Sequence, residues 1–155
     1  FECVESVRLM RPDGSIFEVR GSELEVRYRE VPALKENIGL SAVLRGRHAD
    51  PDEIASTMNS YSQKRWKSQP AMPSAGCIFK NPAECPAGKL IDEVGLKGLS
   101  VGGAEVSHVH GNFMVNKGGA RATDILELIE LVRSRVREAR GIELETEVIM
   151  MGEDA

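Results

Sequence analysis

The 155-residue sequence is poor in aromatic side chains and lacks long apolar runs. Aromatic residues make up 5% of it, so we expect a core built mainly from Val, Leu, Ile and Met. The apolar runs are too short to span a bilayer. The formal net charge of −4 disfavours broad binding to nucleic acids or anionic membranes. The basic residues in the run 64–67 could still bind a small anionic ligand. We therefore expect neither a nucleic-acid nor a membrane partner.

Cysteine is also scarce. The three cysteines, Cys3, Cys77 and Cys85, form an odd and sparse set, which fits a reducing cytoplasm better than a disulfide framework. No Cys-x-x-Cys pair occurs, and the three histidines lack the spacing of zinc ligands. We therefore expect a cytoplasmic protein without a metal site.

The sequence begins with Phe1-Glu2-Cys3 and shows no start methionine, no signal peptide and no helix-capping residues there. Such a beginning is typical of the middle of a domain. We therefore expect the chain to be part of a longer protein.

Turn residues predict strands near the start of the chain. Residues 6–10 and 16–19 have extended patterns on either side of Pro12-Asp13-Gly14, which is a strong turn sequence. This arrangement predicts a β-hairpin. The mostly apolar residues 38–45 predict a further strand.

A helix is expected after this strand. Asp50 suits its N-cap, Pro51 its first position and Glu53 the third position of a capping box. We expect the helix to end before Pro70. Its apolar stripe at helical spacing is formed by Ile54, Met58 and Tyr61.

The second part of the chain mixes short strands with helices. Residues 89–94 predict a short helix, and residues 112–116 predict a buried strand. A long helix with one apolar face is expected over 123–140, capped by its first residue and ended by Gly141. Alternating Glu and other side chains predict a last strand over 143–151. Because short strands and separate helices replace a regular βαβ alternation, the predicted fold class is α+β.

The most informative stretch is Pro73-Ser74-Ala75-Gly76-Cys77-Ile78-Phe79-Lys80-Asn81-Pro82. Its small residues form a loop that presents the thiol of Cys77, and Ala75-Gly76 allows a ligand to approach the backbone closely. Lys80 supplies positive charge, and Asn81 can donate and accept hydrogen bonds. The alternative interpretation is a turn before a strand, with Cys77 as an inert buried residue.

This stretch resembles the signature of the UDP-N-acetylenolpyruvoylglucosamine reductase family, in which small residues and Ala-Gly-Ser precede a hydrophobic residue and Phe-Lys-Asn-Pro. Residues 87–98 resemble the family's next helix, residues 101–116 the following block, and residues 144–148 the closing Leu-Glu-Pro-Glu-Val. The four blocks occur in the family's order and cover roughly residues 70–152. Earlier in the chain the match is looser and rests chiefly on Tyr28-Arg29.

The resemblance implies a bacterial flavoenzyme of cell-wall synthesis. In this family NADPH reduces FAD, the flavin passes hydride to the enolpyruvyl double bond of a UDP-sugar, and a side chain protonates the neighbouring carbon. The product is UDP-N-acetylmuramate, a peptidoglycan precursor. This chemistry needs a cationic group that stabilises the substrate carboxylate, and an acid that delivers the final proton.

The resemblance implies three catalytic residues and several that bind substrate. Cys77 occupies the position of the family's Ser proton donor, and its thiol, with a reference pKa of about 8.5, donates a proton more readily than a hydroxyl. Arg29 corresponds to the Arg that stabilises the substrate carboxylate, which a guanidinium can hold with two hydrogen bonds. Glu147 corresponds to the active-site Glu. The implied substrate-binding residues are Tyr28, Lys67, Lys80, Asn81 and His110.

Each of these residues also fits a structural role. Tyr28 and Arg29 could be a strand aromatic and a surface charge, and Glu147 could belong to a solvated strand face. Lys67 could lie at a solvated helix end, and His110 in an exposed loop. For the whole protein, the alternatives are a non-catalytic UDP-sugar-binding module or an inactive fragment.

The resemblance also implies that an N-terminal segment, whose glycine-rich residues grip the flavin diphosphate, is missing from this sequence. Gly102-Gly103 and Gly118-Gly119 match neither a P-loop nor a dinucleotide-binding fingerprint, so we interpret them as tight turns. We expect the chain alone to be inactive. Residues 1–69 would be the C-terminal part of the FAD-binding domain, and residues 70–146 a small α+β substrate-binding domain. Residues 147–155 would be a terminal strand that packs on the missing N-terminal domain.

Overall fold

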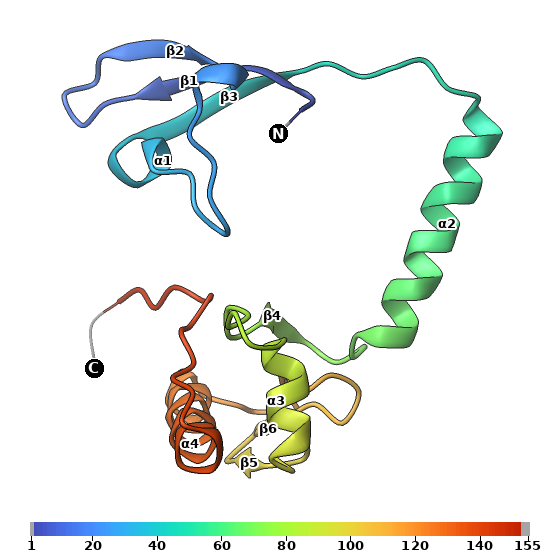
Figure 1. Ribbon diagram of the computed structural model, residues 1–155, viewed down its shortest axis with the longest axis vertical. Helices are drawn as coiled ribbons and strands as arrows, with labels where there is room; N and C mark the ends of the chain where they lie inside the picture. Colours follow the sequence, from blue (N-terminus) through green and yellow to red (C-terminus); the bar gives the residue numbers. More distant parts are fainter. Residues whose placement is uncertain (1, 153–155) are drawn as a thin grey trace. The chain divides into compact units, whose positions relative to one another are not determined.

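The computed structural model describes residues 2–152. The chain divides into two compact units, Phe1–Ile54 and Ala55–Ala155, and each has its own antiparallel sheet (Figure 1). Both units also contain helices. This mixture confirms the predicted α+β fold class. The functional boundary predicted after residue 69 stays a prediction.

Unit 1 (Phe1–Ile54) is built on a three-stranded sheet with the order β2-β1-β3. Its strands are β1 (Val4–Met10), β2 (Ile16–Arg20) and β3 (Ile38–Leu44), and its short helices are η1 (Gly21–Glu23) and α1 (Ala33–Glu36). The hairpin predicted from the turn residues is confirmed by β1 and β2. In its turn Gly14 has a φ of 84°, and the Asp13 side chain accepts the Ser15 N–H at 2.9 Å.

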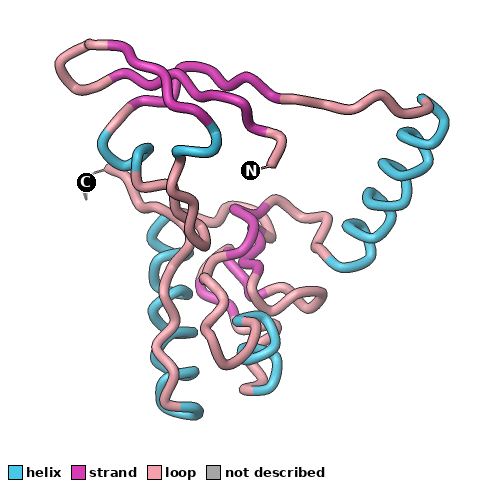
Figure 2. The backbone as a smooth tube through the Cα atoms, turned by 45° about the horizontal axis from the view of Figure 1, so that its top comes forward, coloured by secondary structure: helices cyan, strands magenta, loops and turns pink. Residues whose placement is uncertain are grey.

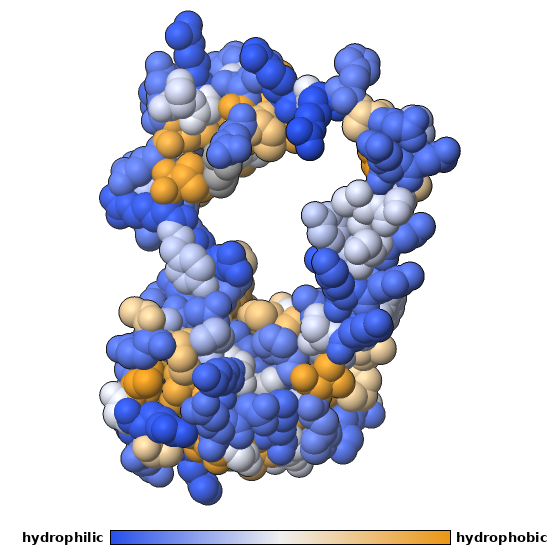
Figure 3. Space-filling model, turned by 45° about the vertical axis from the view of Figure 1, so that its right-hand side comes forward, coloured by the Kyte–Doolittle hydropathy of each residue, from blue (hydrophilic) through white to orange (hydrophobic). Residues whose placement is uncertain are grey.

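Unit 1 buries few large apolar side chains. Among its described residues, only Leu9 belongs to the buried apolar set. Figure 3 shows apolar side chains, in orange, at the surface of this unit. The exposed members include Ile16, Leu34, Ile38, Leu40, Val43 and Leu44. The main core therefore lies in unit 2.

The helix expected near residue 50 is α2 (Pro51–Ser68). The Asp50 side chain accepts the N–H groups of Asp52 at 2.9 Å and Glu53 at 3.3 Å, which confirms Asp50 as the N-cap. No residue of this helix is buried, so its apolar stripe has the predicted spacing but lies outside the core. Within residues 2–152, no helix is both long and apolar enough to cross a membrane.

Unit 2 (Ala55–Ala155) contains a four-stranded sheet with the order β4-β7-β6-β5. Its strands are β4 (Ser74–Cys77), β5 (Ser100–Val101), β6 (Ala104–Val106) and β7 (Phe113–Asn116), and two of its helices are α3 (Ala87–Glu93) and α4 (Ala122–Arg140). Figure 2 shows the strands in magenta and the helices in cyan. Sheet and helices share one core, in which Val, Leu and Ile predominate, and the buried aromatic side chains include Phe79 and Phe113.

The start of α4 differs from the prediction. Thr123 was expected to cap the helix, but α4 begins at Ala122 and its N-cap is Arg121. The Asp124 carboxylate accepts the N–H groups of Arg121 at 3.0 Å and Gly103 at 3.2 Å. These backbone hydrogen bonds lower the pKa of Asp124 below its ordinary value. One buried carboxylate therefore joins the start of α4 to the turn before β6.

The end of the chain also differs from the prediction, because residues 143–151 form no regular strand. A single bridge pairs Thr146 with Phe79. The N–H groups of Glu147 and Val148 both donate to the Ile78 carbonyl, at 2.8 and 3.5 Å. Two successive residues therefore share one acceptor, and the hydrogen bonds do not form the ladder of a regular strand. The proposed packing of residues 147–155 stays a prediction, and residues 153–155 lie outside the described residues.

Candidate active site

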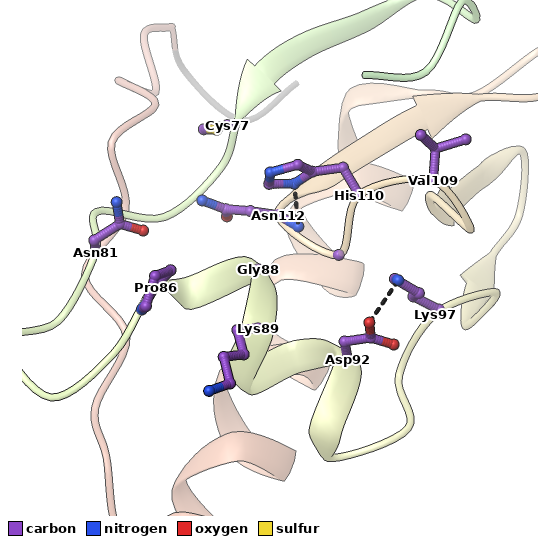
Figure 4. A pocket seen from close by; sticks show the side chains of 11 residues that line it. Cys77, Asn81, Pro86, Gly88, Lys89, Asp92, Lys97, Val109, His110 and Asn112 are labelled. Atoms are coloured by element: carbon purple, nitrogen blue, oxygen red, sulfur yellow. Dashed lines mark hydrogen bonds and ion pairs between the residues drawn. The ribbon is translucent and has the colours of Figure 1, made fainter. Parts of the chain in front are cut away.

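A hollow of about 400 Å³ lies in unit 2 beside the end of β4 and the start of α3 (Figure 4). Three residues singled out from the sequence, Cys77, Asn81 and His110, line it together. Its volume lies within the range of small-molecule sites, which is about 300–1,000 Å³. We call it the Cys77 hollow. Its charged lining residues are Lys89, Asp92 and Lys97.

Cys77 is the last residue of β4. The pairing between β4 and β7 shifts between Ser74 and Cys77, and Gly76 has a φ of 83° there. A residue with a Cβ would be strained in that conformation. Such an irregularity redirects the next side chain, and Cys77 is half-buried at the wall of the hollow. The thiol can thus contact a ligand in the hollow.

Asn81 and Lys80 have different surroundings although they are neighbours. The Asn81 side chain accepts the Ala87 N–H at 3.0 Å and so caps the start of α3. The Lys80 ammonium forms an ion pair with Glu145, and the Lys80 N–H donates to the Glu145 carbonyl at 2.8 Å. Lys80 is not one of the residues that line the hollow. The structure therefore places Asn81 in the hollow and pairs Lys80 with the C-terminal segment.

The His110 ring lies at the wall of the hollow beside Asn112 (Figure 4). Its Nδ1 accepts the Asn112 N–H at 3.2 Å. Burial lowers the pKa of His110 below its ordinary value of 6.5, and the positive charge of Lys97 lowers it further. At neutral pH the imidazole is therefore neutral, and the acceptor role of Nδ1 assigns its proton to Nε2.

Two lysines in the hollow were not identified from the sequence. Lys97 pairs with Asp92 at 2.6 Å, and Lys89 lies 3.7 Å from Glu93. Both lysines lie in the block 87–98, so the resemblance of that block was the signal that could have found them. Each of the two lysines thus has a carboxylate partner. The lining of the hollow contains both lysines and one aspartate, Asp92.

Asn112 holds the segment after β4 against β7. This residue was not identified from the sequence either. It is buried, and its side chain accepts the Phe79 N–H at 2.9 Å and donates to the Phe79 carbonyl at 2.8 Å. Its own carbonyl accepts the Ile78 N–H at 2.9 Å. Three hydrogen bonds thus fix the residues that follow Cys77. No local sequence pattern predicts this role, because the partners are 33 residues apart.

Tyr28 and Arg29 belong to unit 1 and form the two central residues of a tight turn. Arg27 and Glu30 close this turn with two backbone hydrogen bonds of 2.8 and 3.2 Å. Arg29 has a φ of 57°, and it is the only non-glycine residue with a positive φ within residues 2–152. This conformation is unfavourable by about 1–2 kcal/mol for a residue with a Cβ, and such strain is concentrated at functional sites. The Arg29 guanidinium lies 5.2 Å from the Tyr28 ring centre.

The remaining predicted residues do not line the hollow. Glu147 is half-buried, and its N–H donates to the Ile78 carbonyl at 2.8 Å, so its backbone lies beside the residue that follows Cys77. Lys67 lies in the last turn of α2 and is exposed. The hollow therefore unites Cys77, Asn81 and His110, while Glu147 is connected to it through the backbone.

The two glycine pairs lie where the chain bends sharply, and one N–H of each pair meets a side chain of the protein. The Gly103 N–H donates to the Asp124 carboxylate at 3.2 Å. The Asn116 side chain accepts the Gly118 N–H at 2.8 Å and the Ala120 N–H at 3.2 Å. Side chains of the protein therefore already accept one N–H of each glycine pair. Among residues 2–152, no three His, Cys, Asp or Glu residues gather as metal ligands.

Comparisons with known proteins agree with one another. Residues 69–151 match the family model described as UDP-N-acetylenolpyruvoylglucosamine reductase, C-terminal domain. The chain is 44% identical over 155 residues to the UDP-N-acetylenolpyruvoylglucosamine reductase of Clostridioides difficile (strain 630), covering 99% of this chain and 51% of that protein. It is 42% identical over 144 residues to the reductase of the same name from Bacillus licheniformis, covering 91% and 78%.

A solved structure gives the same result. The crystal structure of UDP-N-acetylenolpyruvylglucosamine reductase from Thermus caldophilus is similar to this chain with a TM-score of 0.78 and 41% identity. The match covers 94% of this chain and 52% of that chain. The chain likewise spans about half the length of the reductases from Clostridioides difficile and Syntrophomonas wolfei, at 51% and 52%.

Proposed function

The chain belongs to the UDP-N-acetylenolpyruvoylglucosamine reductase family, and from this premise we propose that it supplies the substrate-binding part of such an enzyme. The proposed reaction is the NADPH-dependent, flavin-mediated reduction of UDP-N-acetylglucosamine enolpyruvate to UDP-N-acetylmuramate for peptidoglycan synthesis. The observation that supports it most is the single hollow lined by Cys77, Asn81 and His110. We place the reaction in the cytoplasm, where the free thiols would remain reduced.

FAD and NADPH are the proposed cofactors of the whole enzyme. In each of the two glycine pairs of the described residues, a side chain already accepts one N–H that a flavin diphosphate would need. We therefore propose that the flavin is held mainly by residues outside this chain. In this organisation residues 1–69 complete the flavin domain, residues 70–146 bind the substrate, and residues 147–155 pack on the remaining domain.

The UDP-sugar would occupy the Cys77 hollow. Its volume of about 400 Å³ suits part of such a ligand rather than an entire protein partner. Lys89 and Lys97 offer ammonium groups for an anionic oxygen, and Asp92 fixes Lys97 at 2.6 Å. Asn81 and His110 add directional polar groups to the same wall. This combination of cationic and neutral donors fits a nucleotide sugar.

Cys77 is the proposed proton donor. The proton would leave Sγ and bond to the carbon next to the one that receives hydride, and solvent would later restore the thiol. A thiol carries a transferable proton, which is what a general acid in this reaction needs. Its half-buried place at the end of β4 lets it contact a substrate in the hollow. A cysteine would thus perform the task that a serine performs in the family signature.

Arg29 and Glu147 complete the proposed catalytic group. Arg29 would hold the substrate carboxylate, and the strained turn with its φ of 57° supports a functional role for this residue. Glu147 would assist the acid, because its backbone is bonded to Ile78 directly after Cys77. Tyr28, Lys67 and Lys80 remain proposed substrate contacts of the complete enzyme, and Lys80 also forms the ion pair with Glu145.

Variants of Cys77 in the full-length enzyme test the proton donor. We expect Cys77→Ala to lower kcat by about 100-fold or more, because general acid catalysis contributes about that much. Cys77→Ser should keep most of the activity, since its hydroxyl also carries a transferable proton. Cys3→Ala, which removes an exposed thiol of unit 1, is the matched control and should change nothing. Unchanged turnover of Cys77→Ala would contradict the assignment.

A further inference from the structure

Residues 143–148, which follow α4, run beside the residues that come after Cys77, and we call them the C-terminal strap (Figure 4). Two hydrogen bonds of 2.8 Å join the strap to this part of the chain, from the Lys80 N–H to the Glu145 carbonyl and from the Glu147 N–H to the Ile78 carbonyl. The strap therefore determines where the backbone of Glu147 lies relative to Cys77.

The beginning of the strap is held from another side by Arg133 of α4. Its Nε donates to the Leu144 carbonyl at 3.1 Å, and its Nη2 donates to the Glu143 carboxylate at 2.9 Å. Its Nη1 donates to the Glu130 carboxylate on the same helix at 2.7 Å, which fixes the guanidinium itself. The Leu144 side chain is fully buried in the core of unit 2. The strap thus begins at a residue that is fixed through both its side chain and its carbonyl.

The hydrogen bond to the Leu144 carbonyl is the contact of Arg133 that fixes the backbone. The side chain of Arg133 is 32% exposed, and those of Glu130 and Glu143 are 64% and 56% exposed. Ion pairs at such exposure contribute little to stability, because water screens them. The carbonyl of a buried residue, in contrast, needs a donor. Arg133 therefore acts on the strap chiefly through Nε.

We propose that Arg133 is a positioning residue of the reductase, which holds the C-terminal strap so that Glu147 lies beside the Cys77 acid. The inference rests on the proposed function, since it assigns a support to the proposed active-site Glu147. A misplacement of about 1 Å at a reacting group can lower a rate about 100-fold, even when the substituted residue is far from the substrate. Arg133 can therefore affect turnover without contacting the substrate.

Three substitutions of Arg133 separate its backbone contact from its charge. Arg133→Gln places an amide nitrogen as many bonds from the backbone as Nε, so it keeps a donor for the Leu144 carbonyl and loses both ion pairs. Arg133→Lys keeps the charge but carries its nitrogen one bond farther out. In the full-length enzyme we expect kcat to fall about 10- to 100-fold in Arg133→Ala and Arg133→Lys and to be retained in Arg133→Gln.

The matched control is Arg135→Ala, on the exposed surface of the same helix, and it should leave kcat unchanged. A glutamine variant as impaired as the alanine variant, or an alanine variant with full turnover, would overturn the proposal. Recovery by lysine and not by glutamine would assign the effect to charge and would also overturn it.

Flavin absorbance in stopped flow shows which half of the reaction depends on Arg133. Arg133→Ala should leave flavin reduction by NADPH unchanged and slow its reoxidation by the enolpyruvyl UDP-sugar, because the proposed role of Glu147 belongs to the second half. Equal slowing of both halves would indicate a general structural defect and overturn the proposal. The double variant Arg133→Ala/Glu147→Gln should reoxidise no more slowly than Glu147→Gln, since Arg133 acts through Glu147. Effects that multiply would contradict this.

Amide hydrogen exchange of the full-length enzyme separates this inference from the proposed function. In Arg133→Ala the amides of the C-terminal strap should exchange about tenfold faster than in the wild type, as loss of one hydrogen bond predicts, and in Arg135→Ala they should not. Unchanged exchange in Arg133→Ala would overturn the positioning role whatever the enzyme catalyses. Faster exchange in an enzyme that does not reduce the UDP-sugar would instead refute the proposed function and, with it, the catalytic importance of the strap.

Discussion

Replacing Asn112 by alanine tests how the segment after β4 is held beside the Cys77 hollow. The side chain is buried and makes hydrogen bonds to the Phe79 N–H at 2.9 Å and the Phe79 carbonyl at 2.8 Å. Phe79 is only 1% exposed, so water cannot easily replace these two bonds. Each buried backbone group left without a partner costs about 1–3 kcal/mol. With partial relaxation, we expect Asn112→Ala to lower the free energy of unfolding by about 2–4 kcal/mol.

Urea unfolding followed by circular dichroism measures this loss. The midpoint should fall while the slope with urea concentration stays the same, since the substitution changes stability and not the surface exposed on unfolding. Asn59→Ala, on the exposed surface of α2, is the control and should change the free energy by less than about 0.5 kcal/mol. A loss below about 1 kcal/mol for Asn112→Ala would refute the reasoning, because the two bonds would then contribute little.

Asn112→Asp separates the two hydrogen bonds. The carboxylate still accepts the Phe79 N–H, but it places a second oxygen against the Phe79 carbonyl, where the amide group donates. At neutral pH this variant should therefore be at least as unstable as Asn112→Ala. As the pH falls and the carboxyl group takes up a proton, it regains a donor, so part of the stability should return. A variant as stable as the wild type at neutral pH would contradict this account.

Two further predictions concern the strained turn and the start of α4. Arg29→Gly should leave the unfolding midpoint unchanged or raise it, because glycine adopts a φ of 57° without strain. The same substitution should lower kcat of the full-length enzyme about 100-fold, because the guanidinium is lost. If Arg29→Gly were less stable than the wild type but fully active, Arg29 would have a structural role and not a catalytic one. The pKa of Asp124 lies below its ordinary value of 3.8, so its stabilisation is present above pH 3.8 and is lost as the pH falls through the lowered pKa. As the pH falls below 3.8, the free energy of unfolding should therefore decrease less for Asp124→Asn than for the wild type. The same pH dependence of stability in variant and wild type would exclude the role of Asp124.

Local signals in the sequence predicted the elements that depend on nearby residues. Pro12-Asp13-Gly14 predicted the hairpin turn, and Asp50 predicted the start of α2, since both act on backbone groups within a few positions. Gly141 ends α4 with a φ of 67°, as its conformational freedom allows. The capping of α4 was predicted less well, because Asp124 also bonds Gly103, which lies 21 residues away. Helix start signals contain no information about such a distant partner.

The same distinction applies to the candidate active site. Cys77, Asn81 and His110 were identified through the family resemblance, and the structure brings them to one hollow. The close approach of the His110 ring to Gly88, where a Cβ would come within 2.8 Å of the ring, could not be predicted, because it depends on the packing of α3 against a loop 22 residues later in the chain. The irregular pairing of residues 145–148 with Ile78–Lys80 was missed for a similar reason. Alternating side chains predict an extended segment, but they do not determine the register of its partner.

The most direct test of the proposed function is a visible absorbance spectrum of the full-length enzyme, followed by NADPH oxidation with and without the enolpyruvyl UDP-sugar. Our account predicts a yellow flavoprotein whose sustained NADPH oxidation requires the UDP-sugar and yields UDP-N-acetylmuramate. A colourless protein that still binds the UDP-sugar would contradict the reductase function and favour a non-catalytic binding module.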